Sequence, residues 1–161
     1  MQNVVPKYTL WGEMIREFEG LKLKAYSNKG DVPTIGFGST YNYTAKRKVK
    51  LGDIITVAEA SRWLQIDNQE VVRLANHYIT QKLTSEQSTA ICDYIYNRGI
   101  GNFLSTQLDE LINANPNDPR IGAEIRGTGL TDRLKRVLPG LVRRRKAQAH
   151  LYEKGQLKFY F

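Results

Sequence analysis

The stretch Phe18-Glu19-Gly20-Leu21-Lys22, followed further on by Pro33-Thr34-Ile35-Gly36-Phe37-Gly38, decides the fold of this chain. Upstream of Glu19, apolar residues recur at helical spacing from Leu10 to Phe18, and Thr9 is the expected N-cap. Glycine, here Gly20, is the residue that commonly follows the last turn of a helix. The sequence therefore predicts a short helix over residues 9–19 that ends on Glu19.

A small antiparallel sheet is predicted immediately after this helix. Between Leu21 and Tyr43, glycines and a proline lie among β-branched and aromatic residues. That composition is typical of short strands joined by tight turns.

Helices are expected over most of the remaining chain. Thr56–Glu59 and Thr84–Gln87 are capping boxes, which predict two helix starts. A proline-rich turn at 115–119 separates later helical patterns. The expected helical segments are 56–79, 84–99, 103–114 and 141–151.

The order of helix, small sheet and further helices indicates an α+β protein. We expect a single domain, 1–161. It consists of a small N-terminal antiparallel sheet lobe at about 20–55 and a helical C-terminal lobe at about 56–155, packed with helix 9–19. A cleft is expected between the lobes, where ligand sites commonly lie.

Length and composition restrict the class of protein. A chain of 161 residues buries a core without disulfide support, and its one cysteine, Cys92, lies in an apolar pattern that predicts a buried thiol. The N-terminus lacks the basic start and apolar run of a secretory signal, and no stretch of about 18 apolar residues occurs. We therefore expect no stable membrane anchor and accumulation in the cytoplasm.

The net charge of +8 favours polyanionic partners: nucleic acid, anionic lipid or a bacterial wall. The chain has no zinc-finger spacing and no RNA-recognition signature, and its histidines, His77 and His150, form no cluster in the sequence. Neither specific nucleic-acid binding nor a metal is expected. The run Arg143-Arg144-Arg145-Lys146 predicts either a solvated helix face or an element that packs against the lobe that carries the catalytic residues and meets an anionic wall.

Glu19 is the candidate catalytic residue, because it lies at the end of a predicted helix and is followed by a glycine-rich segment. A carboxyl group in this place meets a tight hairpin whose Thr34 hydroxyl can point back across a groove. Glycoside hydrolysis needs an acid that protonates the leaving oxygen, while a second group handles water or the developing cation. The alternative on these residues alone is a glutamate on the helix surface, as most glutamates are.

Six separated motifs support the interpretation of Glu19 as a catalytic residue. They are Phe18-Glu19-Gly20, Ala25-Tyr26, Thr34-Ile35-Gly36-Phe37-Gly38, Leu83-Thr84-Ser85-Glu86-Gln87, Asn97-Arg98-Gly99-Ile100-Gly101-Asn102-Phe103 and Leu138-Pro139-Gly140-Leu141-Val142-Arg143-Arg144-Arg145. Together they resemble, in the same order, the catalytic module of phage endolysin lysozymes, glycoside hydrolase family 24. The resemblance spans residues from roughly 10 to 155.

This resemblance implies a lysozyme-like fold and hydrolysis of the β-1,4 bond between N-acetylmuramic acid and N-acetylglucosamine in bacterial peptidoglycan, leading to host lysis. It implies Glu19 as the general acid and Thr34 as the hydroxyl that places the water or the sugar. The expected partner is the glycan strand, and the protein is a monomer that needs no cofactor and stays in the host cytoplasm until its release to the wall. The residues expected along the substrate groove are Tyr26, Phe37, Asn97, Gly99 and Phe103.

The chain departs from the family pattern at Asn28. The family carries aspartate or cysteine at this position, and an amide acts neither as a general base nor as a carboxylate nucleophile. Asp31 either takes over that role or stabilises the turn at Lys29-Gly30-Asp31. Two further alternatives are a lytic transglycosylase acting on the same bond and a catalytically weak glycan-binding protein. Ser39 also replaces a histidine that the family tends to carry.

Restoring the carboxylate tests these alternatives. If position 28 is the slot of the second catalytic group, Asn28→Asp raises peptidoglycan hydrolysis by roughly 10²- to 10⁴-fold, the usual contribution of a positioned general base. Asp31→Asn then changes the rate little. Lysis rates of both variants beside the parent measure this. An unchanged rate in Asn28→Asp, with loss in Asp31→Asn, would assign the role to Asp31, and anhydro-sugar products would indicate transglycosylation.

Overall fold

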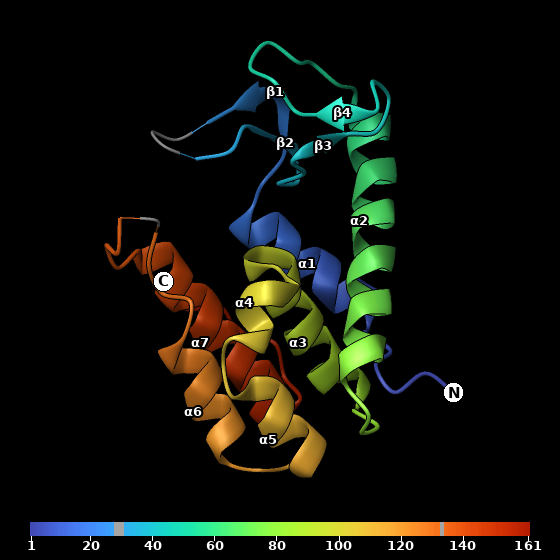
Figure 1. The fold of residues 1–161 in the computed structure, drawn as a ribbon. Helices are drawn as coiled ribbons and strands as arrows, with labels where there is room; N and C mark the ends of the chain where they lie inside the picture. The colour runs from blue at the N-terminus through green and yellow to red at the C-terminus, as the bar shows by residue number, and fades with distance from the viewer. Residues whose placement is uncertain (28–30, 133) are drawn as a thin grey trace. The chain divides into compact units, whose positions relative to one another are not determined.

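The computed structural model describes residues 1–27, 31–132 and 134–161. The chain forms two compact units: residues 13–69, called here the sheet unit, and residues 1–12 together with 70–161, called the helical unit. Figure 1 labels helices α1 (Tyr8–Phe18) and α2 (Val57–Tyr78). Residues of each helix fall in both units.

Helix α1 ends where the sequence predicts, but it begins earlier. The backbone N–H groups of Glu19 and Gly20 still make helical hydrogen bonds, and Gly20 then adopts a φ of +67°, which ends the helix. The expectation that Thr9 is the N-cap is wrong. The carbonyl of Lys7 already accepts from the N–H of Trp11, so Thr9 lies inside the first turn.

The sheet unit contains two antiparallel pairs of strands. Strand β1 (Lys22–Tyr26) pairs with β2 (Thr34–Gly36), and β3 (Tyr41–Asn42) pairs with β4 (Arg47–Lys48). The predicted antiparallel sheet is thus confirmed, in the form of two small ribbons. Together with the helices they make the α+β class expected from the sequence.

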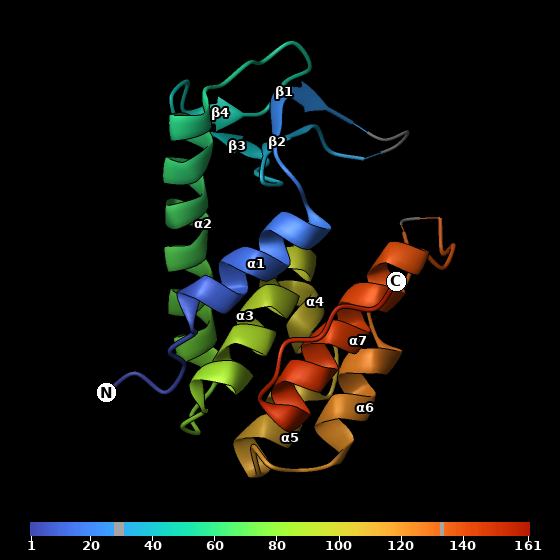
Figure 2. The ribbon, with the colours of Figure 1, turned by 180° about the vertical axis from the view of Figure 1, so that it is seen from behind.

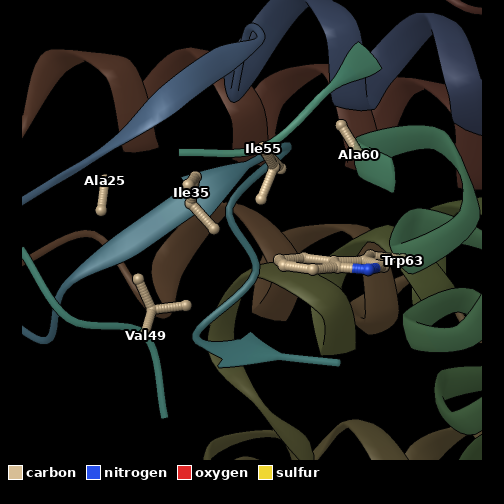
Figure 3. Packing of buried hydrophobic residues seen from close by; sticks show 6 residues of the cluster. All are labelled: Ala25, Ile35, Val49, Ile55, Ala60 and Trp63. Carbon is tan, nitrogen blue, oxygen red and sulfur yellow. The ribbon is translucent and has the colours of Figure 1, made fainter. Parts of the chain in front are cut away.

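A compact apolar cluster joins the strands of the sheet unit to the first part of α2. Its members are at most 7% exposed, and the half-buried rings of Phe37 and Tyr43 pack against it. The buried members, shown in Figure 3, are Ala25, Ile35, Val49, Ile55, Ala60 and Trp63. Because β1, β2 and α2 share this cluster, the turn that follows β2 is held by the core of the unit.

The described residues of the helical unit form five helices besides its parts of α1 and α2. They are α3 (Ser85–Arg98), α4 (Ile100–Leu104), α5 (Leu108–Ala114), α6 (Arg120–Gly127) and α7 (Pro139–Lys154). Helix α7 packs against both α3 and α6 (Figure 2). None of the helices in the described ranges combines the length and the apolar composition needed for crossing a bilayer.

Both predicted capping boxes are present. Thr56 and Glu59 exchange side-chain and backbone hydrogen bonds at the start of α2, and Thr84 and Gln87 do the same at α3. Cys92, on α3, is fully buried as predicted, and burial raises the pKa of its thiol.

The segment 103–114, predicted as one helix, is two. Helix α4 ends at Leu104, and α5 begins only at Leu108. Between them, the hydroxyl of Thr106 donates to the carbonyl of Phe103 and accepts from the N–H of Leu108. A threonine side chain that binds nearby backbone groups in this way competes with the regular helical pattern, which explains the break.

The arginine run on α7 is not a solvated face throughout. Arg143 is exposed, but Arg144 is 2% exposed and its guanidinium makes two hydrogen bonds of 2.9 Å to the carboxylate of Asp93 on α3. Arg145 is also fully buried, and its guanidinium lies 4.3 Å from the ring centroid of Tyr94. The prediction that this run meets an anionic wall is therefore wrong for its two central arginines.

The buried ion pair generates a prediction on stability. Asp93→Ala leaves the guanidinium of Arg144 buried without its carboxylate, a loss that typically costs about 3–5 kcal/mol. The matched control is Glu70→Ala, which removes a carboxylate bound to Arg73 at 2.7 Å but exposed to solvent, where ion pairs contribute little. Denaturant titration measures both. Equal, small losses of unfolding free energy would contradict a structural role for the buried pair.

Candidate active site

Glu19 stands at the junction between α1 and β1. Its backbone N–H donates to the carbonyl of Ile15 at 2.9 Å, so the residue completes the last turn of the helix. Its side chain is half-buried. A negative charge at the C-terminal end of a helix does not stabilise that helix. Helix stability therefore does not explain why a glutamate occupies this position.

A tight turn brings the backbone of the glycine-rich segment to this carboxyl group. Ile35 and Ser39 exchange two backbone hydrogen bonds, of 3.0 and 2.9 Å, which close the turn. Inside it, Gly38 has a φ of +98°, and a Cβ atom built on it would lie 3.2 Å from Oε2 of Glu19. The segments around Glu19 and Gly38 therefore lie next to each other within the sheet unit.

Thr34 opens strand β2 and is half-buried. Its register partner across the antiparallel pair is Tyr26, at the end of β1. Side chains alternate along a strand, so Thr34 projects to the side opposite Ile35, which belongs to the apolar cluster. The hydroxyl of Thr34 is therefore directed away from that cluster.

Of the two candidates for a second catalytic group, Asn28 and Asp31, the structure describes only Asp31. Asn28 lies outside the described residues. Asp31 is exposed, and its backbone carbonyl accepts a hydrogen bond of 2.8 Å from the hydroxyl of Ser27. This bond ties the two sides of the loop together through the backbone of Asp31 and leaves the role of its carboxylate a prediction.

The residues expected along the groove are distributed over both units. In the sheet unit, Tyr26 is half-buried and Phe37 packs against the apolar cluster. In the helical unit, the side-chain oxygen of Asn97 accepts from Arg145, and Gly99 is exposed with a φ of +80°. Phe103 is fully buried against the ring of Tyr94, so its ring has no free face for stacking on a sugar.

Sequence reasoning missed Asp67, a residue of α2 that braces the turn at Gly38. Its carboxylate accepts hydrogen bonds from the Tyr43 hydroxyl and from Ser39, the residue that follows Gly38. Burial raises the pKa of Asp67, and the two hydrogen bonds partly offset that effect. A signal was present in the sequence: Asp67 lies one helical turn after Trp63, on the face that a buried tryptophan marks.

Comparisons with known proteins show the family to which the chain belongs. Residues 16–148 match the phage lysozyme family. The chain is 33% identical over 141 residues to an endolysin of Acyrthosiphon pisum secondary endosymbiont phage 1, covering 87% of this chain and 92% of that relative. It is 32% identical over 150 residues to an endolysin of Bacillus phage PZA, covering 90% of this chain and 54% of that longer relative.

A solved structure gives the same result. The endolysin from Escherichia coli O157:H7 phage FAHEc1 superposes with a TM-score of 0.83 at 26% identity, over 98% of this chain and 99% of the other. The family match over residues 16–148 includes Glu19, the turn at Gly38 and helices α3 to α6, and it ends within α7. This chain belongs to the phage lysozyme family.

Proposed function

We propose that this protein is an endolysin, a muramidase that hydrolyses the β-1,4 bonds between N-acetylmuramic acid and N-acetylglucosamine in bacterial peptidoglycan and so lyses the host cell. Membership of the phage lysozyme family and the endolysin relatives support this function. The observation that connects this function with particular residues is the close approach of the Gly38 backbone to the carboxyl group of Glu19.

Glu19 is proposed as the general acid. A carboxylic acid held in one place protonates the glycosidic oxygen as the bond breaks, which makes the leaving sugar a better leaving group. The approach of the Gly38 backbone limits the positions open to the carboxyl group, and such restriction is what a positioned acid requires.

The second catalytic task is the activation of water or the stabilisation of the developing cation. We assign it to the loop that follows β1, with Thr34 orienting the water or the sugar. Position 28 is the proposed slot of the second group, and Asp31 is its alternative. Asn28 has no carboxylate, which keeps a lytic transglycosylase as the second candidate function, because in that reaction a hydroxyl of the sugar itself attacks.

The glycan strand is the proposed partner of a monomeric enzyme. Tyr26 and Phe37 are proposed to contact it from the sheet unit, and Asn97 and Gly99 from the helical unit. We propose that the protein collects in the host cytoplasm and reaches the wall after its release by another protein. Phe103 is left out of the binding residues because its side chain is fully buried.

Removing the proton of the proposed acid tests this function. Glu19→Gln keeps the shape of the side chain and is expected to lower the hydrolysis of purified peptidoglycan by roughly 10²- to 10⁴-fold. Glu17→Gln, an exposed position on the same helix, is the matched control and should retain the parental rate. A folded Glu19→Gln protein with near-parental activity would rule out Glu19 as the acid.

The contact at Gly38 gives a second, independent test. In Gly38→Ala the added Cβ meets Oε2 of Glu19 at 3.2 Å, so the carboxyl group has to shift by a few tenths of an ångström. Since misplacement by about 1 Å can cost 10²-fold in rate, we expect kcat to fall by roughly tenfold. Gly52→Ala is the control, because Gly52 has a φ of +99° and no atom within 4 Å of its added Cβ. Equal rates for the two alanine variants on purified peptidoglycan would show that the contact does not position Glu19.

A further inference from the structure

The sheet unit carries a surface that the proposed hydrolysis does not use. We call it the turn surface and define it by Lys24, Lys48, Lys50, Leu51 and Ile54. Leu51 is 66% exposed and Ile54 is 74% exposed, and all three lysines are exposed. Leu51 directly follows Lys50 in the sequence, so an exposed apolar side chain and an exposed cation are neighbours along the chain.

The turn that presents Leu51 is held firmly from inside. The N–H of Asp53 donates to the carbonyl of Lys50 at 3.1 Å, and Gly52 between them has a φ of +99°, as the third position of a type II turn requires. The carboxylate of Asp53 accepts from the backbone N–H of Lys50 at 3.0 Å and from Arg47 at 2.8 and 2.9 Å. These bonds hold the pKa of Asp53 well below its usual range. The fold thus presents Leu51 to solvent from a fixed turn.

Strand pairing places a cation beside Ile54. The segment after the turn lies alongside β1 (Figure 1), with hydrogen bonds of 2.9 Å from Ala25 to Asp53 and from Ile55 to Leu23. Lys24 is the register partner of Ile54. Residues directly opposite in an antiparallel pair have side chains on the same face, about 5 Å apart at Cβ. Because Ile55 points into the apolar cluster, Ile54 and Lys24 project together on the outer face.

The charge around this surface is strongly one-sided. Residues 21–56 contain seven basic and two acidic residues, so this segment accounts for +5 of the net charge of +8. Arg47 is paired with Asp53. Within the described residues, no ion pair engages Lys24, Lys48 or Lys50. These three ammonium groups are available to an anionic partner.

We propose that the turn surface docks on a lipid bilayer with anionic headgroups. Apolar side chains that enter the headgroup and acyl boundary, flanked by lysines that meet anionic lipid, are the combination used by peripheral membrane binding. An anionic polymer would be bound by the lysines alone and would leave Leu51 and Ile54 without a role. The contact is peripheral and separate from the hydrolysis assigned to Glu19.

Flotation with vesicles tests the proposal. The parent protein is expected to bind vesicles of phosphatidylglycerol and phosphatidylcholine, to bind pure phosphatidylcholine vesicles much less, and to dissociate as salt is raised. Lys24→Gln with Lys50→Gln should weaken binding about fivefold for each lysine removed. Leu51→Gln with Ile54→Thr should weaken it by roughly tenfold. The latter pair should hydrolyse purified, membrane-free peptidoglycan at the parental rate.

Leu134→Gln with Val137→Thr is the matched control, because these residues of the helical unit are 69% and 61% exposed, while of the described cations beside them Arg136 is paired with Asp132 and Lys135 is a single exposed lysine. This variant should bind like the parent. No preference of the parent for the anionic vesicles would overturn the proposal, as would an equal loss in the control. Binding that depends on the lysines but not on Leu51 and Ile54 would also overturn it, in favour of an anionic polymer.

Discussion

The approach of the Gly38 backbone to the carboxyl group of Glu19 is the contact on which the proposed chemistry depends. It requires a residue without a side chain, since an added Cβ would lie 3.2 Å from Oε2, and a backbone φ of +98°, which glycine adopts without strain. The turn is closed by the pairing of Ile35 with Ser39 and braced by Asp67. The strand before it is fastened by Ile35 to the apolar cluster of the sheet unit.

Buried charges organise the helical unit in a different way. Asp93 binds Arg144, and Gln148 donates to the same carboxylate, so α3 and α7 are joined by charge and hydrogen bonds inside the packed helices. Arg145 extends the network to Asn97 and lies over the ring of Tyr94. Because Arg144 and Arg145 are buried, they do not contribute to the basic surface of the protein. In the sheet unit, exposed positive charge includes Lys24, Lys48 and Lys50, around the Lys50–Asp53 turn.

Local signals predicted most of the helices and the position of Glu19 at a helix end, because each depends on neighbours in the sequence. The capping boxes at Thr56 and Thr84 and the helix stop at Gly20 were legible from residue type and spacing alone. The same local reasoning gave wrong helix boundaries in two places. It placed Thr9 as a cap and ran a helix through Thr106, whose hydroxyl binds the backbone on both sides.

The sequence by itself determined the α+β order, the buried thiol of Cys92 and the family resemblance, and it singled out Glu19 as the proposed acid, since periodicity and motif spacing are properties of the linear chain. Only the tertiary structure decided which polar residues are inside. Arg144 and Asp93 are 51 positions apart in the sequence. Arginine and aspartate are each expected at the surface, and they are buried here because they form an ion pair. Asp67 with Ser39, and Gly38 with Glu19, are likewise pairs of residues distant in the sequence. A contact between distant residues depends on how the elements pack, and packing energy is not encoded in any one segment.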